Sequence, residues 1–288
     1  MAATTLTCGP YSLELGGPTR IMGIVNVTPD SFSDGGRFFS TECAVAQAMQ
    51  LVQEGADILD IGGESTRPFS DPVDEREELD RVLPVIESLS GKVSVPISID
   101  TTKASVARQA VAAGATLIND VSALRMDPQM AETAGQCRVP LILMHMLGSP
   151  KTMQVKPVYN DLIPDIIEFL KEAMDRAIAA GVAPNQIIVD PGIGFGKTID
   201  HNLEILRDLD RFRELSVPLL IGTSRKMFIR HLLKGNSQID LDPLCTEVAR
   251  GTQATVAAAA MKGAQIVRVH DVARTRTTLT IVDAIRSV

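Results

Sequence analysis

Six polar side chains stand where short apolar runs of the sequence end, and their types suit the binding of a polar ring. They are Asn26, Asp60, Asp100, Asn119, Asp190 and Arg268. Singly they have ordinary explanations: Asp100 could cap a helix, Asp190 could set a turn, and Asn119 could bond its own backbone. Six together are harder to explain in this way, because a buried carboxylate without a partner is costly. A bound heterocycle with N–H groups would supply that partner.

Two long loops and several cationic side chains predict that the same site handles an anion. The loops span residues 27–40, with the sequence TPDSFSDGGRFF, and 62–74, with GGESTRPFSDPVD. Loops of this kind also occur as plain surface segments, but glycine, serine and threonine beside an arginine can offer N–H groups and a guanidinium to an oxyanion. Arg225 and Lys226 follow one apolar run, and Arg268 and His270 end the next. We therefore expect an anionic small substrate.

The composition argues against several other classes of function. The chain carries 28 Lys and Arg against 35 Asp and Glu, a formal net charge of −7, which disfavours general nucleic-acid or acidic-membrane binding. No apolar run is long enough to cross a bilayer, and residues 1–19 lack the Lys or Arg of a signal or transit peptide. The four cysteines have no paired spacing, which fits thiols in a reducing compartment. We predict a cytoplasmic protein with no nucleic-acid and no membrane partner.

Two apparent motifs are set aside. The segment DPGIGFGKT ends like a Walker A loop, but Pro191 stands where that loop needs its first glycine. His145 and His201 lack metal-ligand spacing and His231 lies in an expected helix, so core or surface roles fit all three histidines better than metal binding.

The elements that must position the polar side chains recur along the whole chain. Short runs rich in β-branched residues are expected as strands at 21–26, 58–61, 97–100, 117–119, 141–144, 187–190, 219–222 and 266–269. Their starts lie about 35 residues apart, which leaves room for a helix and two loops in each unit. Nearly continuous apolar character is typical of parallel strands buried on both faces. We predict an α/β fold, a (β/α)8 TIM barrel, whose polar strand ends meet at one face; a doubly wound sheet is the alternative.

A weak internal repeat supports the barrel. Gly-Ala precedes an expected strand at Gly55, Gly114 and Gly263, where a helix would end with glycine in a left-handed conformation. A helix expected at 41–54 carries its apolar residues on one face. Residues 5–20 are expected to form a hairpin that plugs the bottom of the barrel. We predict one domain over 1–288, with the barrel at about 20–286.

The motifs together resemble one enzyme family. MGIVNVTPDSFSDGG (Met22 to Gly36), GGESTRP, SIDT, IND, MHM, DPGIGFGK, GTSRK and RVHD occur in the order found in dihydropteroate synthases, over residues 20–275. The resemblance implies a Mg²⁺-dependent condensation of 6-hydroxymethyl-7,8-dihydropterin pyrophosphate with 4-aminobenzoate, giving 7,8-dihydropteroate and pyrophosphate. It also implies a homodimer formed through outer helices near the seventh and eighth units.

Roles for individual residues follow from the matched motifs. For the pterin ring, the resemblance implies contacts by Asp100, Asn119, Asp190 and Lys226, between apolar walls made by Met144 and Phe195, with Gly222 also lining the substrate site. For the anionic groups, it implies that Asn26 binds Mg²⁺ with the pyrophosphate, Arg268 and His270 hold the phosphates, Thr66 and Arg67 lie on the closing second loop, and Ser224 meets the aminobenzoate carboxylate. Phe69 and Leu147 depart from the residues usual in the family.

The implied mechanism is a dissociative displacement without a protein nucleophile, with the pterin pyrophosphate binding first. Two alternatives share parts of the pattern. A methyltetrahydrofolate–corrinoid methyltransferase would keep the barrel and the pterin carboxylates but has no use for the two long loops. A non-catalytic pterin-binding module could lose Asn26, Arg67 and Arg268, all of which are present here. A metal-dependent aldolase lacks support, because the sequence shows no histidine cluster and no lysine on a strand.

Overall fold

The strands form two sheets in the computed structural model, which describes residues 4–28, 37–65, 71–235, 237 and 239–288. The smaller sheet is an antiparallel hairpin of β1 (Thr4–Cys8) and β2 (Tyr11–Leu15). The larger sheet contains β3 (Arg20–Asn26), β4 (Ile58–Gly62), β5 (Ile97–Asp100), β6 (Leu117–Asp120), β7 (Leu141–Met144), β8 (Ile187–Asp190), β9 (Leu220–Ile221) and β10 (Ile266–Val269).

The eight strands of the larger sheet close into a parallel barrel. Their order is β8-β7-β6-β5-β4-β3-β10-β9, and the two outer strands meet at a parallel bridge between Val189 and Leu219. All eight expected strands are confirmed, each within one residue at both ends. The α/β barrel prediction is therefore confirmed, and the doubly wound sheet is not formed.

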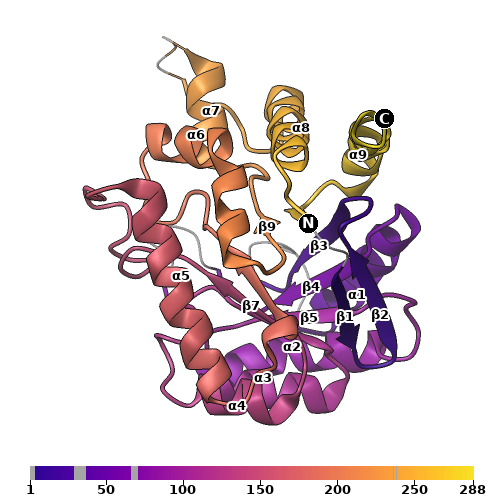
Figure 1. The fold of residues 1–288 in the computed structure, drawn as a ribbon. Helices are drawn as coiled ribbons and strands as arrows, with labels where there is room; N and C mark the ends of the chain where they lie inside the picture. Colours follow the sequence, from indigo (N-terminus) through magenta and orange to yellow (C-terminus); the bar gives the residue numbers. More distant parts are fainter. Residues whose placement is uncertain (1–3, 29–36, 66–70, 236, 238) are drawn as a thin grey trace.

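Helices surround the barrel on its outside (Figure 1). They are α1 (Arg37–Gln53), α2 (Glu75–Leu89), α3 (Ala104–Ala113), α4 (Met130–Cys137), α5 (Leu162–Ala179), α6 (Ile199–Arg207), α7 (Met227–Lys234), α8 (Thr246–Met261) and α9 (Val272–Arg286), with 3₁₀ turns η2 (Pro184–Gln186) and η3 (Leu209–Leu215). The glycines of the internal repeat end helices as expected, because Gly55, Gly114 and Gly263 have φ of 99°, 122° and 103°.

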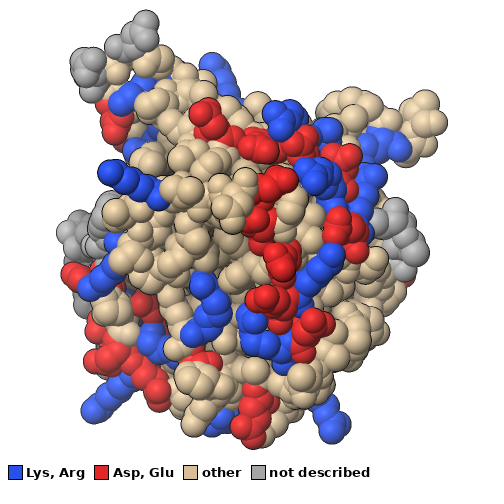
Figure 2. Space-filling model, turned by 60° about the vertical axis from the view of Figure 1, so that its left-hand side comes forward, with Lys and Arg blue, Asp and Glu red and all other residues tan. Residues whose placement is uncertain are grey.

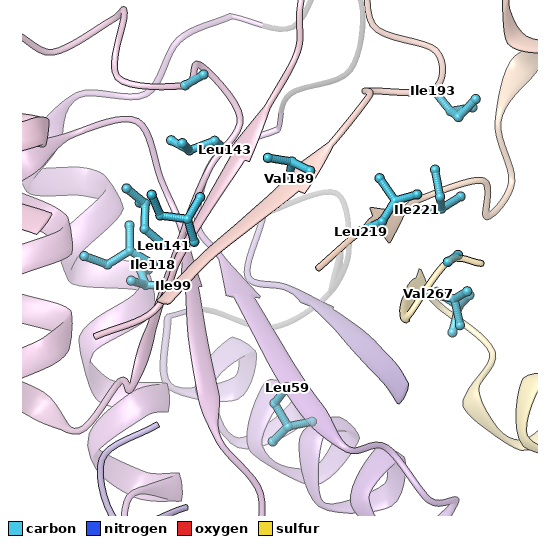
Figure 3. Close-up of a cluster of buried hydrophobic side chains, with 14 of the residues drawn as sticks. Leu59, Ile99, Ile118, Leu141, Leu143, Val189, Ile193, Leu219, Ile221 and Val267 are labelled. Atoms are coloured by element: carbon cyan, nitrogen blue, oxygen red, sulfur yellow. The ribbon is translucent and has the colours of Figure 1, made fainter. Parts of the chain in front are cut away.

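The main core lies between the strands and the helices. Figure 3 shows strand residues such as Leu59, Ile99 and Ile118 in this layer, and none of the three is exposed to solvent. These side chains alternate along each strand with those that point into the barrel. Because each strand is buried on both sides, its sequence is apolar almost throughout, which is why the strands could be recognised as parallel.

The hairpin closes one end of the barrel, as expected from residues 5–20. Its Leu6, Cys8, Leu13 and Leu15 form one cluster with inward-facing residues of the strands, namely Met22, Ile58, Leu117, Ile142, Ile188, Leu220 and Ile266. Burial raises the pKa of the Cys8 thiol to about 12, so Cys8 serves as an apolar core residue. The hairpin thus leaves the opposite end of the barrel, at the carboxyl ends of the strands, for a site.

The molecular surface carries both signs of charge. Figure 2 shows acidic and basic side chains interspersed over the face that it presents. None of the helices in the described parts of the chain has the length and apolar character needed to cross a membrane.

Candidate active site

A layer of polar side chains lies inside the barrel, immediately above the apolar layer that contacts the hairpin. Asp60, Asn119, Asp190 and Arg268 each stand two positions after an inward-facing apolar residue of their own strand, so all four point into the barrel. Asp100 pairs in register with Asn119 and joins the same layer. Asp60, Asp100, Asn119 and Asp190 are buried. The structure therefore brings together five of the six residues that the sequence placed singly at strand ends, all but Asn26.

Arg268 connects two carboxylates of this layer. Its Nε donates to Asp60 Oδ2 at 2.5 Å, and one terminal nitrogen donates to Asp100 Oδ2 at 2.6 Å. The Asn119 amide also donates to Asp60 Oδ2, at 3.2 Å. Gly62 lies beside this network, and a Cβ there would contact the Asp100 Cβ at 3.4 Å. Asp60 is thus the common acceptor that orients side chains from β6 and β10.

Burial and the shared guanidinium act in opposite directions on the charges of this group. Burial raises the pKa of Asp100 to about 7, which Arg268 opposes and the neighbouring Asp60 carboxylate reinforces. Burial disfavours the charge of Arg268, but Asp60 and Asp100 outweigh this and raise its pKa. Arg268 therefore remains a cation at neutral pH, while the proton occupancy of Asp100 changes near neutrality.

Asp190 presents one carboxylate oxygen to the inside of the barrel. Its Oδ1 accepts from the Gly192 N–H at 2.7 Å, so Asp190 has the turn-forming role that its sequence context suggests. Its Oδ2 accepts no hydrogen bond from the described residues, which leaves it able to bind a ligand. Burial raises the pKa of Asp190 to about 6, although the Gly192 N–H and the cations of Lys226, Lys197 and Arg268 lower it. Asp190 is mainly ionised at pH 7.

An apolar wall stands beside the polar layer. Met144 and Phe195 belong to one buried cluster with Val121, Met146 and Met153. The Lys226 ammonium lies 4.0 Å from the centre of the Phe195 ring, a cation–π contact. A wall of this kind next to bonding groups suits a flat heterocycle. Leu147, which departs from the family pattern, is partly exposed near this wall. A Cβ added at Gly196 would lie 2.6 Å from the Cβ of Leu147.

The ends of β9 and β10 bring a hydroxyl and an imidazole together. Ser224 Oγ lies 2.9 Å from His270 Nδ1 and accepts from the His270 backbone N–H at 3.3 Å. Arg225, between Ser224 and Lys226, has a φ of 59°, a strained value for a side chain of its size. At Gly222 an added Cβ would be in ordinary van der Waals contact with the Arg268 Cβ, at 3.8 Å.

Asn26 ends β3 beside Gly62 and is half-buried. Within the described residues, no three His, Cys, Asp or Glu side chains gather as metal ligands. The side-chain oxygen of Asn26 is a donor of the kind that Mg²⁺ prefers, and Mg²⁺ that keeps several waters needs only one or two protein ligands. Thr66 and Arg67 of the second loop, and Phe69 beside them, lie outside the described residues.

Two of the ordinary explanations for the strand-end residues are wrong. Asp100 does not cap the following helix; the Ala104 N–H there bonds Asp127 Oδ2 at 2.8 Å. The Asn119 side chain donates to Asp60 and, among the described residues, does not bond its own backbone. The core or surface roles expected for His145 and His201 agree with the structure. His145 is buried in the core, and the His201 ring accepts from the Thr198 N–H in a capping box.

Sequence reasoning missed the roles of two buried residues. Asp60 stood among the strand-end residues but had no assigned partner, and only the fold brings it to Arg268. Lys197 ends the DPGIGFGK segment that was set aside as a false Walker motif, yet it is buried next to His145. The conflict between a lysine and the apolar pattern around it is the signal that could have found it.

Comparisons with known proteins agree with this geometry. A family model described as pterin binding enzyme matches residues 22–270. With the barrel and its polar layer, this match places the chain in the pterin binding enzyme family. Dihydropteroate synthase of Synechocystis sp. is 48% identical over 267 residues, 93% of this chain and 90% of that protein. The Bacillus subtilis enzyme of the same name is 48% identical over 91% of this chain and 87% of its own.

Solved structures show the same relationship. Xanthomonas albilineans dihydropteroate synthase with 4-aminobenzoic acid has a TM-score of 0.90 and 45% identity, over 100% of both chains. The structure of that enzyme in complex with 7,8-dihydropteroate has a TM-score of 0.87 and 44% identity, over 99% of both. Within the pterin-binding family the chain therefore belongs to the dihydropteroate synthases, which are transferases. Neither the corrinoid methyltransferase nor the non-catalytic module is favoured.

Proposed function

We propose that the chain joins 6-hydroxymethyl-7,8-dihydropterin pyrophosphate to 4-aminobenzoate, releasing 7,8-dihydropteroate and pyrophosphate, and that the polar layer of the barrel is its pterin site. The Oδ2 of buried Asp190, which accepts no hydrogen bond from the part of the chain that the structure describes, is the observation that carries this assignment. The aminopyrimidine edge of a pterin offers adjacent N–H donors, which an ionised carboxylate accepts with good geometry. Asn119 and Asp100 line the same layer and would bond the other polar edges of the ring.

The flat faces of the pterin would lie against the apolar wall. Met144 and Phe195 supply apolar surface, and Lys226 extends over the Phe195 ring with a cation for a carbonyl or ring nitrogen. Arg268, held by Asp60 and Asp100, keeps its charge and its direction. In this assignment the protein binds the ring through groups that are already oriented before it arrives.

The leaving pyrophosphate would be held at the ends of β3 and β10. Asn26 would hold Mg²⁺ together with the pyrophosphate, and Mg²⁺ would stabilise the negative charge that develops as that group departs. Arg268 and His270 would bind the phosphate oxygens, with Ser224 beside the imidazole to orient it. In the family pattern Ser224 would also meet the aminobenzoate carboxylate, and Thr66 and Arg67 would close over the reacting centre.

The chemistry needs no nucleophile from the protein. The C–O bond between the pterin methylene and the pyrophosphate breaks, and its electron pair leaves with the pyrophosphate oxygen. The aniline nitrogen then forms the new C–N bond and loses a proton. The residues of this chain bind and orient both partners and stabilise the departing charge, and loop closure excludes water.

Measurement of both products tests the proposal. With pterin pyrophosphate, 4-aminobenzoate and Mg²⁺ the purified protein should release pyrophosphate and form dihydropteroate in equal amounts, and EDTA should stop both. Product formation only after addition of a second protein would favour a partner-dependent enzyme, and pterin binding without any product would favour a binding module.

We also propose a cytoplasmic homodimer. An apolar hollow of about 570 Å³ between α6 and α8 supports a packing face for a second copy, and Leu203 and Met261 at its rim are 39% and 51% exposed. These helices lie near the seventh strand unit of the barrel (Figure 1). Light scattering should give twice the monomer mass for the wild type, and Met261→Glu should reduce that mass toward the monomer. A monomeric wild-type protein at micromolar concentration would refute the dimer.

A further inference from the structure

The segment between β8 and α6 holds the Phe195 ring on an unusual backbone. Gly192, Gly194 and Gly196 have φ of 72°, 80° and 65°, a region that favours glycine. At Gly194 a Cβ would come within 3.0 Å of the Lys226 side chain, so the absence of a side chain lets Lys226 approach the ring. A backbone with so many glycines is intrinsically adaptable, and something else must fix it if Phe195 is to stand in one place.

Three side chains bond this backbone on both sides of Phe195: Gln154 and Tyr159 from the segment between β7 and α5, and Asn202 from α6. The Gln154 amide donates to the Gly194 carbonyl and the Asn202 side chain accepts from the Gly194 N–H, both at 2.7 Å. The Tyr159 hydroxyl donates to the Gly196 carbonyl, also at 2.7 Å. These bonds hold the residues before and after Phe195 but leave its own carbonyl unaccounted for.

Lys197 supplies the missing bond. Its Nζ donates to the Phe195 carbonyl at 3.0 Å and lies 2.8 Å from His145 Nδ1. Lys197 is 2% exposed and forms no ion pair with a carboxylate in the described parts of the chain. Burial, with the nearby Lys197 and Arg125, lowers the pKa of His145 to about 2, so its ring stays neutral and Nδ1 can accept. The Lys197 amino group thus finds two acceptors.

The position of His145 is fixed independently of Lys197. Its backbone N–H donates to the Asp190 carbonyl at 2.9 Å, and its ring packs edge-on against Phe169 with the ring centres 4.7 Å apart. His145 therefore provides an anchored acceptor, and Lys197 connects that anchor to the backbone of Phe195. A buried lysine is costly: its two direct acceptors are neutral, and the nearby Asp190 carboxylate attracts its charge without forming an ion pair with it in the described residues. An apolar residue would serve a purely structural core better.

We propose that Lys197 is a positioning residue for substrate binding: by joining the Phe195 carbonyl to His145 it holds the Phe195 ring in place against Lys226. The proposal rests on the proposed function, in which Phe195 lines the site for the substrate rings. Lys197 does not touch the substrate and takes no part in bond breaking. Its effect should therefore fall on binding of the flat rings more than on turnover.

Fluorine NMR observes the ring directly. Protein labelled with 4-fluorophenylalanine has eight fluorinated rings, and the signal of residue 195 is identified by its loss in Phe195→Leu. Lys197→Met, which keeps the length and apolar stem of the side chain, should shift or broaden that signal. Lys171→Met, at an exposed lysine paired with Glu214, is the matched control and should leave it unchanged.

Steady-state kinetics supply the second readout. In Lys197→Met the KM for pterin pyrophosphate or 4-aminobenzoate should rise about tenfold, as expected for one lost positioning bond, with kcat changed less than about threefold. An unchanged residue 195 signal, or an unchanged KM for both substrates, would overturn the proposal. If Lys197→Met does not fold, Lys197→Gln is measured in the same way, because its shorter polar side chain cannot reach both acceptors. If the wild type forms no dihydropteroate, the proposed function fails, while the fluorine signal still decides whether Lys197 holds the ring.

Discussion

Replacement of Asp190 by asparagine should separate pterin binding from stability. In the wild type one oxygen of Asp190 accepts the Gly192 N–H and the other points into the barrel without a partner in the described residues. The asparagine oxygen can keep the bond to Gly192. Its Nδ2 group then faces the N–H donors of the pterin. Two sets of N–H donors are opposed at the place where the wild-type carboxylate oxygen accepts hydrogen bonds.

The size of both effects follows from the environment of Asp190. Loss of charge-assisted bonds worth about 1.5–3 kcal/mol each should weaken pterin binding by about 3 kcal/mol or more, at least a hundredfold in Kd. Stability should move the other way. With a pKa of about 6 in the folded protein against 3.8 in the unfolded chain, ionised Asp190 costs the native state about 3 kcal/mol above pH 6. A neutral asparagine avoids this cost.

Calorimetric titration with a pterin and thermal unfolding at pH 8 measure the two effects. Asp190→Asn should lose measurable pterin affinity while its Tm stays equal or rises by a few degrees. Asp210→Asn, at a half-exposed carboxylate 3.5 Å from Lys262, is the matched control and should change neither quantity. Unchanged pterin affinity in Asp190→Asn would remove Asp190 from the site, and a large drop in Tm would show that its charge is a structural requirement.

Three further predictions concern substrate binding at the site. Pterin affinity should increase as the pH rises through about 6, because the ionised form of Asp190 accepts the N–H bonds. It should increase further through about pH 7, as Asp100 ionises. A pterin affinity that does not change between pH 5 and 8 would contradict this prediction. Asp60→Ala removes the acceptor shared by Arg268 and Asn119, and should raise the KM for pterin pyrophosphate at least tenfold, with Thr277→Ala on the surface of α9 as an unaffected control. In calorimetry 4-aminobenzoate should bind only after pterin pyrophosphate or pyrophosphate is present; tight binding to the protein alone would exclude the ordered scheme.

The fold could be predicted almost completely because its signals are local. Each barrel strand is a short apolar run, and Gly55, Gly114 and Gly263 mark helix ends through a backbone conformation that glycine adopts readily. β9 is the least regular strand, reduced to two residues, and it joins β8 through one bridge at the point where the barrel closes. Nothing in the residues near Leu219 distinguishes this weak closure from the other strand pairs.

The site could be located from the sequence, but the hydrogen bonds between its residues could not be predicted. The alternation of side chains along a strand places Asp60, Asn119 and Arg268 inside the barrel once the strands are known. Which of them bond depends on the closure of the barrel, since Asp60 and Arg268 are 208 residues apart in the chain. Lys197 escaped notice for the same reason: its two acceptors become neighbours only after β7, β8 and the following loop have packed.

The pterin site is tested most directly by a crystal structure of the protein with a bound pterin. The aminopyrimidine edge should donate to Asp190 Oδ2, with Asn119 and Asp100 on the remaining polar edges and the ring face beside Met144 and Phe195. A pterin bound elsewhere, or bound at the barrel mouth with Asp190 Oδ2 still without a ligand contact, would contradict the assignment of the polar layer.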